Sequence, residues 1–223
     1  QPRTDGKENL ISAVEIATAR DLQGKAIVPE VCIYFNSRLL RGNRSVKINA
    51  TGFDAFGSPN YPPLATAGIS IKYNSSYIHY PQNGHKNFAI HTSLDTRVSI
   101  LKIHPGITEQ AVRDILLGSG TRAGILETYG AGNAISKDWF LRIVREADRM
   151  GKVLLNVTQC LSGDVDMDIY ATGRNLKDAG VISGHDATTE SALGKLFYLM
   201  GNYDDNAKVK ALLEKNLKGE ISK

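Results

Sequence analysis

The second half of the chain alternates between short apolar runs and longer stretches in which apolar residues recur every three or four positions. The apolar runs predict strands at Val98–Ile103, Ala123–Thr128, Lys152–Val157 and Val181–Ser183. The periodic stretches predict helices near Thr108–Leu117, Lys137–Met150, Thr172–Asp178, Thr188–Met200 and Asp204–Lys218. Strands that alternate with helices are joined by right-handed crossovers and form a parallel sheet. We therefore expect an α/β domain with a parallel sheet of about four strands flanked by helices.

Polar residues and glycine mark the expected ends of these helices. Thr108 and Ser136 are predicted N-terminal caps, because a hydroxyl there can accept a hydrogen bond from a backbone N–H of the first turn. Gly151 is expected to end the helix over residues 137–150 in a left-handed conformation. Asp5 is expected to cap an earlier helix.

The first 90 residues follow a less regular pattern. A helix is predicted over Glu8–Ala19, and extended pieces are predicted at Val31–Phe35, Val46–Asn49, Ile69–Tyr73 and Tyr77–Tyr80. One helix and a few short strands do not readily close a core, so we expect residues 1–86 to be the later part of a larger N-terminal domain. The turn-forming segment Pro81–His85 marks the expected boundary, with 87–97 as a linker and 98–223 as a smaller C-terminal domain.

Composition favours an ordinary globular protein over a nucleic-acid or membrane protein. Hydrophobic residues make up 42% of the chain, and the net charge of +4 is spread over interleaved acids and bases. The apolar runs are too short to span a bilayer. Two cysteines, Cys32 and Cys160, are too few for a secreted disulfide framework, so we expect a reduced, cytoplasmic protein. The chain starts at Gln1 and not at methionine, which is compatible with an N-terminus further upstream.

Basic residues recur every three positions in one stretch, at Arg38, Arg41, Arg44 and Lys47. On a helix they would form one basic face. The pair Gly42-Asn43 interrupts such a helix, however, and Ser45–Ile48 alternates like a strand. The four charges therefore need not converge, which weakens an interpretation as a nucleic-acid-binding surface. From the residues alone, Lys47 is a surface lysine, as most lysines are.

The segment Tyr129-Gly-Ala-Gly-Asn133 lies between a predicted strand and a predicted helix, where α/β sheets bind ligands. A dinucleotide fingerprint would need a third glycine at Ile135, so a nucleotide-binding module ranks a distant third among the functions considered. Two roles for this loop stay open. It could be a tight turn that uses the positive φ of glycine, or it could contact a ligand. The five histidines show no metal-ligand spacing, and we expect neither a metal nor a cofactor.

A cysteine-hydrolase triad is conceivable from Cys160, His185 and Asp186. We disfavour it because no activating motif surrounds Cys160, and a lone cysteine beside an apolar strand is usually a core residue.

Several motifs carry a family resemblance: Thr4-Asp-Gly-Lys-Glu-Asn-Leu10, Tyr129-Gly-Ala-Gly-Asn133, Asn156-Val-Thr-Gln-Cys160, Tyr170-Ala-Thr-Gly173 and Leu217-Lys-Gly-Glu220. With them the chain resembles the type I (cytoplasmic-type) bacterial L-asparaginases of the asparaginase/glutaminase family. The resemblance covers nearly all of the chain but only the later part of the family sequence. It implies hydrolysis of L-asparagine to L-aspartate and ammonia without a cofactor.

The resemblance also implies roles for individual residues. Lys47 matches a lysine that helps to activate a threonine nucleophile, and burial could make such an amine a usable proton acceptor. Asn133 and Tyr170 match residues that reach the active site of a neighbouring subunit, which implies a homodimer or homotetramer with shared active sites. Thr158 and Cys160 lie where some relatives bind asparagine as an effector.

One part of the family pattern does not occur in this sequence. The Thr-Gly-Gly-Thr-Ile strand end that supplies the nucleophile is absent, as is the His-Gly-Thr-Asp segment of the proton relay. We therefore expect an amidohydrolase whose nucleophile comes from an upstream or separate segment. The alternative is a non-catalytic amino-acid-binding sensor or truncated paralogue.

Overall fold

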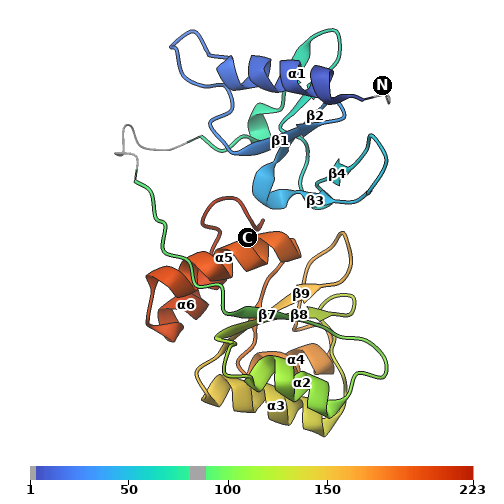
Figure 1. Cartoon of the computed structure of the whole chain (residues 1–223), viewed down its shortest axis with the longest axis vertical. Helices are drawn as coiled ribbons and strands as arrows, with labels where there is room; N and C mark the ends of the chain where they lie inside the picture. Colours follow the sequence, from blue (N-terminus) through green and yellow to red (C-terminus); the bar gives the residue numbers. More distant parts are fainter. Residues whose placement is uncertain (1–3, 81–88, 223) are drawn as a thin grey trace. The chain divides into compact units, whose positions relative to one another are not determined.

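A computed structural model describes residues 4–80 and 89–222, and the chain divides into two compact units, residues 1–90 and 91–223 (Figure 1). Each unit is described by itself. The expected boundary at Pro81–His85 lies outside the described residues, as do the first two residues of the expected linker 87–97.

The second unit is built on a parallel sheet in the order β10-β9-β8-β7. Its strands are β7 (Val98–Lys102), β8 (Ala123–Thr128), β9 (Val153–Thr158) and β10 (Ile182–Ser183). Its helices are α2 (Glu109–Leu117), α3 (Asp138–Arg149), α4 (Ala171–Asp178), α5 (Thr189–Asn202) and α6 (Asn206–Leu213). Helices α2, α3 and α4 cover one face of the sheet, and α5 and α6 cover the other (Figure 1). The predicted parallel α/β sheet is confirmed.

Successive side chains of the central strands point to opposite faces of the sheet and pack into two separate hydrophobic cores. On β8, Ile125 packs with the α5–α6 layer and Leu126 packs with the α2–α4 layer. On β9, Leu155 packs with the α5–α6 layer and Leu154 packs with the α2–α4 layer. Both strands are therefore buried on both sides, which is why they read as continuous apolar runs.

Local sequence signals mark some of the helix ends. The Thr108 hydroxyl accepts a hydrogen bond from the Ala111 N–H at 3.2 Å, and this predicted cap is confirmed. Gly151 follows α3 with a φ of +75°, the left-handed conformation that was predicted. The prediction for Ser136 is wrong, because α3 begins at Asp138 with Lys137 at the cap position and no side-chain cap.

Within its described residues, the first unit contains a small antiparallel sheet and one helix, α1 (Gly6–Thr18), which packs against β1. The sheet has the order β1-β2-β5-β6, with β1 (Cys32–Phe35), β2 (Arg38–Arg41), β5 (Ala65–Ala67) and β6 (Ile71–Tyr73). A separate pair joins β3 (Val46–Lys47) to β4 (Phe56–Gly57), and short 3₁₀ turns lie at η1 (Gly42–Arg44) and η2 (Ser75–Tyr77). The extended piece predicted at Tyr77–Tyr80 is therefore wrong, since its first residue closes a 3₁₀ turn and residues 78–80 form no strand.

Helix α1 has only one buried residue, Ile16, whereas Leu10, Ile11 and Val14 are each more than half exposed. Asp5 occupies the cap position, but its carboxylate accepts a hydrogen bond from the Asn9 side chain and caps no backbone N–H. That the unit is part of a larger domain stays a prediction.

Candidate functional site

Lys47 lies on a short β-hairpin arm. Its strand β3 pairs with β4, which sets Lys47 opposite Phe56, and the ammonium lies 6.0 Å from the centre of the Phe56 ring. The tip of the hairpin is tied by Asn49, whose side-chain oxygen accepts the N–H groups of Thr51 and Gly52 at 3.0 Å each. Lys47 is exposed, so the described residues do not supply the burial that would make this amine a base.

The basic series around Lys47 separates into different environments. Arg38 is exposed, whereas Arg41 and Arg44 are only 5% and 1% exposed. The four residues therefore do not form one exposed basic face. The burial of Arg41 and Arg44 was not predicted, because no local pattern distinguishes a buried arginine from an exposed one.

Asn133 ends a tight loop that follows β8. The loop is closed by reciprocal backbone hydrogen bonds between Tyr129 and Asn133, at 2.9 and 2.8 Å. Gly130 and Gly132 have φ values of +50° and +105°, so both use the backbone freedom of glycine. The side-chain oxygen of Asn133 accepts a hydrogen bond from the Thr172 hydroxyl at 2.7 Å.

This hydrogen bond brings two predicted site residues into one neighbourhood. Thr172 lies in the first turn of α4, and Tyr170 is the residue that precedes this helix. Tyr170 is 54% exposed, whereas Asn133 is only partly exposed. The structure thus places the Asn133 side chain and the Tyr170 backbone at the carboxyl edge of the parallel sheet, where α/β folds bind ligands.

A buried polar network connects the Asn133 loop to strand β9. Asn156 is fully buried on β9; its side-chain oxygen lies 2.6 Å from the Thr128 hydroxyl, and its amide donates to the Gly132 carbonyl at 3.1 Å. Sequence reasoning gave neither Asn156 nor Thr172 a role at the site. A polar Asn156 inside an otherwise apolar strand was the available signal, because a buried amide needs hydrogen-bond partners.

Thr158 and Cys160, the candidate effector residues, flank a structural glutamine. The Thr158 hydroxyl accepts the Cys160 N–H at 3.0 Å. The Gln159 amide between them donates to the carbonyls of Ile103 and Glu127, at 2.6 and 2.8 Å. Cys160 is exposed, so the expectation that it is a core residue is wrong.

The remaining candidates give little support to other chemistry. Asp186 is the acid of the disfavoured cysteine triad. Its carboxylate accepts hydrogen bonds from the backbone N–H and the hydroxyl of Ser222. Among the residues that the structure describes, no group of three or more His, Cys, Asp and Glu side chains is arranged to hold a metal ion. No helix in the same residues combines the length and apolar content that a membrane crossing needs.

Comparison with known proteins relates both units to one family. Residues 97–213 match the family described as Glutaminase/Asparaginase C-terminal domain, and residues 1–79 match Asparaginase, N-terminal. L-asparaginase 1 of Escherichia coli K12 is 40% identical over 222 residues, which cover 99% of this chain and 62% of that protein. The human 60 kDa lysophospholipase is 40% identical over 220 residues, which cover 98% of this chain and 37% of that protein.

Solved structures agree with the sequence matches. L-asparaginase I of Vibrio cholerae superposes with a TM-score of 0.88 at 39% identity, covering 100% of this chain and 64% of that one. The chain thus spans a little over three-fifths of the length of these bacterial L-asparaginases. With both of its units matched in this way, the chain belongs to the glutaminase/asparaginase family.

Proposed function

We propose that this chain forms part of an L-asparagine amidohydrolase, which converts L-asparagine and water to L-aspartate and ammonia. One structural observation carries the proposal beyond family membership. Asn133 and Tyr170, which the family resemblance assigns to the substrate, are held together at the carboxyl edge of the sheet through Thr172. Relatives named L-asparaginase are similar along nearly the whole chain, which supports the same substrate.

In the proposed reaction, a threonine hydroxyl attacks the side-chain amide carbon of asparagine. The proton of that hydroxyl passes towards the amine of Lys47, which acts as the base of the relay. The C–N bond then breaks and ammonia leaves with a proton. Water hydrolyses the resulting ester and releases aspartate. The family nucleophile motif does not occur among these 223 residues, so the threonine is supplied from outside them.

The side chain of Asn133 would contact the substrate as a donor. Its oxygen accepts a hydrogen bond from Thr172, and its NH₂ group can donate to a ligand. An NH₂ group pairs with a carboxylate or carbonyl oxygen and not with an ammonium group. We therefore assign Asn133 to an oxygen of the bound amino acid, with Tyr170 beside it.

The proposal includes shared active sites in a homodimer or homotetramer, with Asn133 and Tyr170 serving the neighbouring subunit, and a cytoplasmic location. Closed symmetric assemblies of this kind are common among soluble enzymes. Thr158 and Cys160 stay candidates for an effector site.

Ammonia release from L-asparagine by the complete protein tests the function, with D-asparagine and L-glutamine as comparison substrates. Lys47→Met should abolish turnover, and Lys72→Met is the matched control because Lys72 is an exposed strand lysine of the same unit. Full activity in Lys47→Met would show that another group is the base. Binding of asparagine without any hydrolysis would favour the alternative of an amino-acid-binding sensor.

A further inference from the structure

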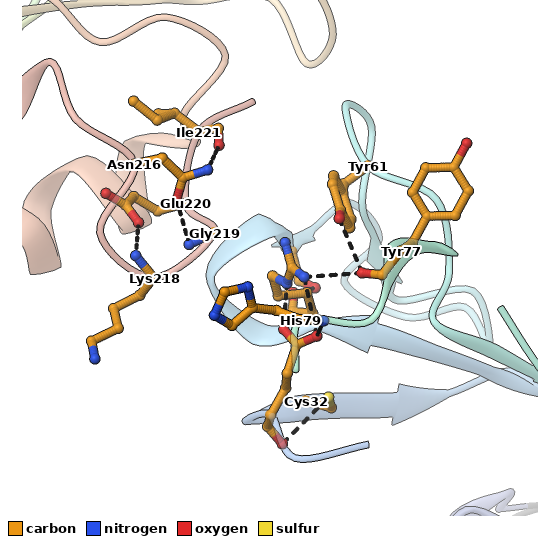
Figure 2. Close-up of polar contacts among 12 residues, drawn as sticks. Cys32, Tyr61, Tyr77, His79, Asn216, Lys218, Gly219, Glu220 and Ile221 are labelled. Atoms are coloured by element: carbon orange, nitrogen blue, oxygen red, sulfur yellow. Dashed lines mark hydrogen bonds and ion pairs between the residues drawn. The ribbon is translucent and has the colours of Figure 1, made fainter. Parts of the chain in front are cut away.

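Two arginines beside Lys47 are buried, and the reaction proposed above does not use them. Both guanidinium groups lie over the ring of Tyr61, with distances to its centre of 4.4 Å for Arg41 and 5.2 Å for Arg44. Cations are attracted to the face of an aromatic ring, and the attraction strengthens as water is excluded. Tyr61 is itself fixed, because its hydroxyl donates to the Tyr77 carbonyl at 3.0 Å (Figure 2).

Arg41 joins segments that are far apart in sequence. It forms two hydrogen bonds with Glu30, Nε to Oε2 at 2.5 Å and Nη2 to Oε1 at 3.0 Å, and Nη2 also donates to the Tyr77 carbonyl at 3.0 Å. The same Glu30 accepts the backbone N–H of His79 at 2.6 Å. The side chains of the pair are 6% and 9% exposed. Burial opposes the charge, but the hydrogen bonds and charges of Glu30 and Tyr61 together raise the pKa of Arg41.

Arg44 closes the base of the hairpin that carries Lys47. Its Nη2 donates to the carbonyl of Asn60 at 3.2 Å. Asn60 follows β4, the strand that pairs with β3, by three residues. Arg44 therefore connects the turn that enters the hairpin to the segment that leaves it.

The backbone between Arg41 and Lys47 is held by hydrogen bonds at Gly42 and Ser45. The Gly42 N–H donates to the Val31 carbonyl at 2.9 Å, and the Ser45 hydroxyl donates to the Arg41 carbonyl at 2.7 Å. A Cβ on Gly42 would lie 3.0 Å from the Val31 oxygen, so the turn passes close to the neighbouring chain. These contacts tie the segment before Lys47 to Val31 and to the Arg41 backbone.

From this arrangement we infer that Arg41 and Arg44 are positioning residues for Lys47. A buried ion pair is a weak source of stability, because removing charges from water offsets most of their attraction. Fixing the place of the hairpin is a better account of why two guanidinium groups are buried here. The inference rests on the proposed role of Lys47 as the base.

The test compares charge-conserving substitutions at three arginines in the complete protein. A lysine keeps the charge but lacks the planar fork that stacks on Tyr61 and binds Glu30 twice. Arg41→Lys and Arg44→Lys should each lower kcat for asparagine about 10- to 100-fold, as expected for a misplaced catalytic group, with KM changed less than about threefold. Arg38→Lys is the matched control, since Arg38 is exposed on the same strand as Arg41, and it should keep kcat within about twofold.

Thermal unfolding of each variant separates positioning from general damage. Tyr61→Leu, which removes the ring without touching a charge, provides a second route if an arginine variant does not fold. Normal kcat in folded Arg41→Lys and Arg44→Lys, with Lys47→Met inactive, overturns the positioning role. An equal fall in kcat for Arg38→Lys overturns it too. If Lys47→Met itself stays active, the proposed base is wrong, and that failure is distinct from the first.

Discussion

The hydroxyl of Thr172 donates a 2.7 Å hydrogen bond to the side-chain oxygen of Asn133, and this contact links α4 to the loop after β8. The two residues lie 39 positions apart in the chain. The bond orients the side-chain amide of Asn133, whose NH₂ group can donate to a ligand.

Thr172→Val should therefore weaken substrate binding more than catalysis. Valine has the shape of threonine but no hydroxyl, so the Asn133 amide loses its orientation. A lost hydrogen bond of about 1 kcal/mol corresponds to a rise in KM for asparagine of about fivefold. Thr172→Ser keeps the hydroxyl and should restore the KM. An unchanged KM in Thr172→Val, measured by steady-state ammonia release, would show that Asn133 is oriented by other means.

Two glycines of the same loop provide a matched pair for stability. A Cβ on Gly132 would lie 2.8 Å from Val165 and 3.0 Å from the Asn156 amide, whereas one on Gly130 would meet nothing within 4 Å. Both have positive φ, so alanine is strained at either place by about 1–2 kcal/mol. Gly132→Ala should lose at least about 1 kcal/mol more than Gly130→Ala in urea unfolding, because it also disturbs packing. Equal losses would contradict the close approach at Gly132.

A buried ion pair holds the C-terminal segment. The Lys195 ammonium of α5 lies 2.7 Å from Glu220, and the two side chains are 7% and 5% exposed. Glu220 also accepts the N–H groups of Leu217 and Lys218. Lys195→Met should destabilise the protein by about 3–5 kcal/mol, because it removes the cation from a buried carboxylate. The double variant Lys195→Met/Glu220→Leu should recover part of this loss, and a strictly additive result in the double-mutant cycle would rule out coupling.

We expect Asp95 to make a contribution to stability that is lost in acid. The hydrogen bond from Arg97, aided by one from Arg122 at 2.8 Å, holds the pKa of Asp95 well below its usual range. A carboxyl whose pKa is lower in the folded state stabilises that state above its unfolded pKa of about 3.9. The contribution is lost as the pH falls through the folded pKa. Asp95→Asn should therefore be less stable than the parent at pH 7, and the gap should shrink in strong acid.

Urea unfolding at a series of pH values measures that gap. Asp204→Asn is the control, because Asp204 is exposed in the same unit. A gap that stays constant down to strong acid would show that Asp95 does not act through its charge.

The two cysteines should differ in reactivity. Cys160 is exposed, whereas Cys32 is partly buried and burial, together with the charge of Glu30, raises its pKa to about 11. The thiolate is the reactive form, so at pH 8 iodoacetamide should label Cys160 quickly and Cys32 slowly. Mass spectrometry of tryptic peptides gives both rates, and Cys160→Ser should remove the fast phase. Faster labelling of Cys32 would contradict its placement.

The parallel sheet was predictable because the apolar run of each strand can be recognised without knowledge of the other strands. β8 and β9 are buried on both faces, and their runs end at glycine or polar residues that mark turns. Thr108 and Gly151 were predictable for a similar reason, since a cap acts within four residues. Ser136 shows the limit of such local signals, because the helix starts one residue later than a cap at Ser136 would place it.

The site was less predictable because the residues that contact its side chains come from distant segments of the chain. Arg41 is buried through Glu30, Tyr61 and Tyr77, which no local pattern connects to it. Thr172 became relevant only when folding brought α4 beside the Asn133 loop. The roles of Lys47, Asn133 and Tyr170 come from the family resemblance, and they stay predictions for the experiments above to decide.

Gln159 has a consequence for how the sheet opens. Its side chain joins the carbonyls of Ile103 and Glu127, and its own N–H donates to Thr128, so the ends of three neighbouring strands share one residue. Strand ends usually fray before the rest of a sheet. Here fraying of one strand end would break bonds to the others, so the backbone amides of Ile103 and Gln159 should exchange their hydrogens only when the whole unit unfolds.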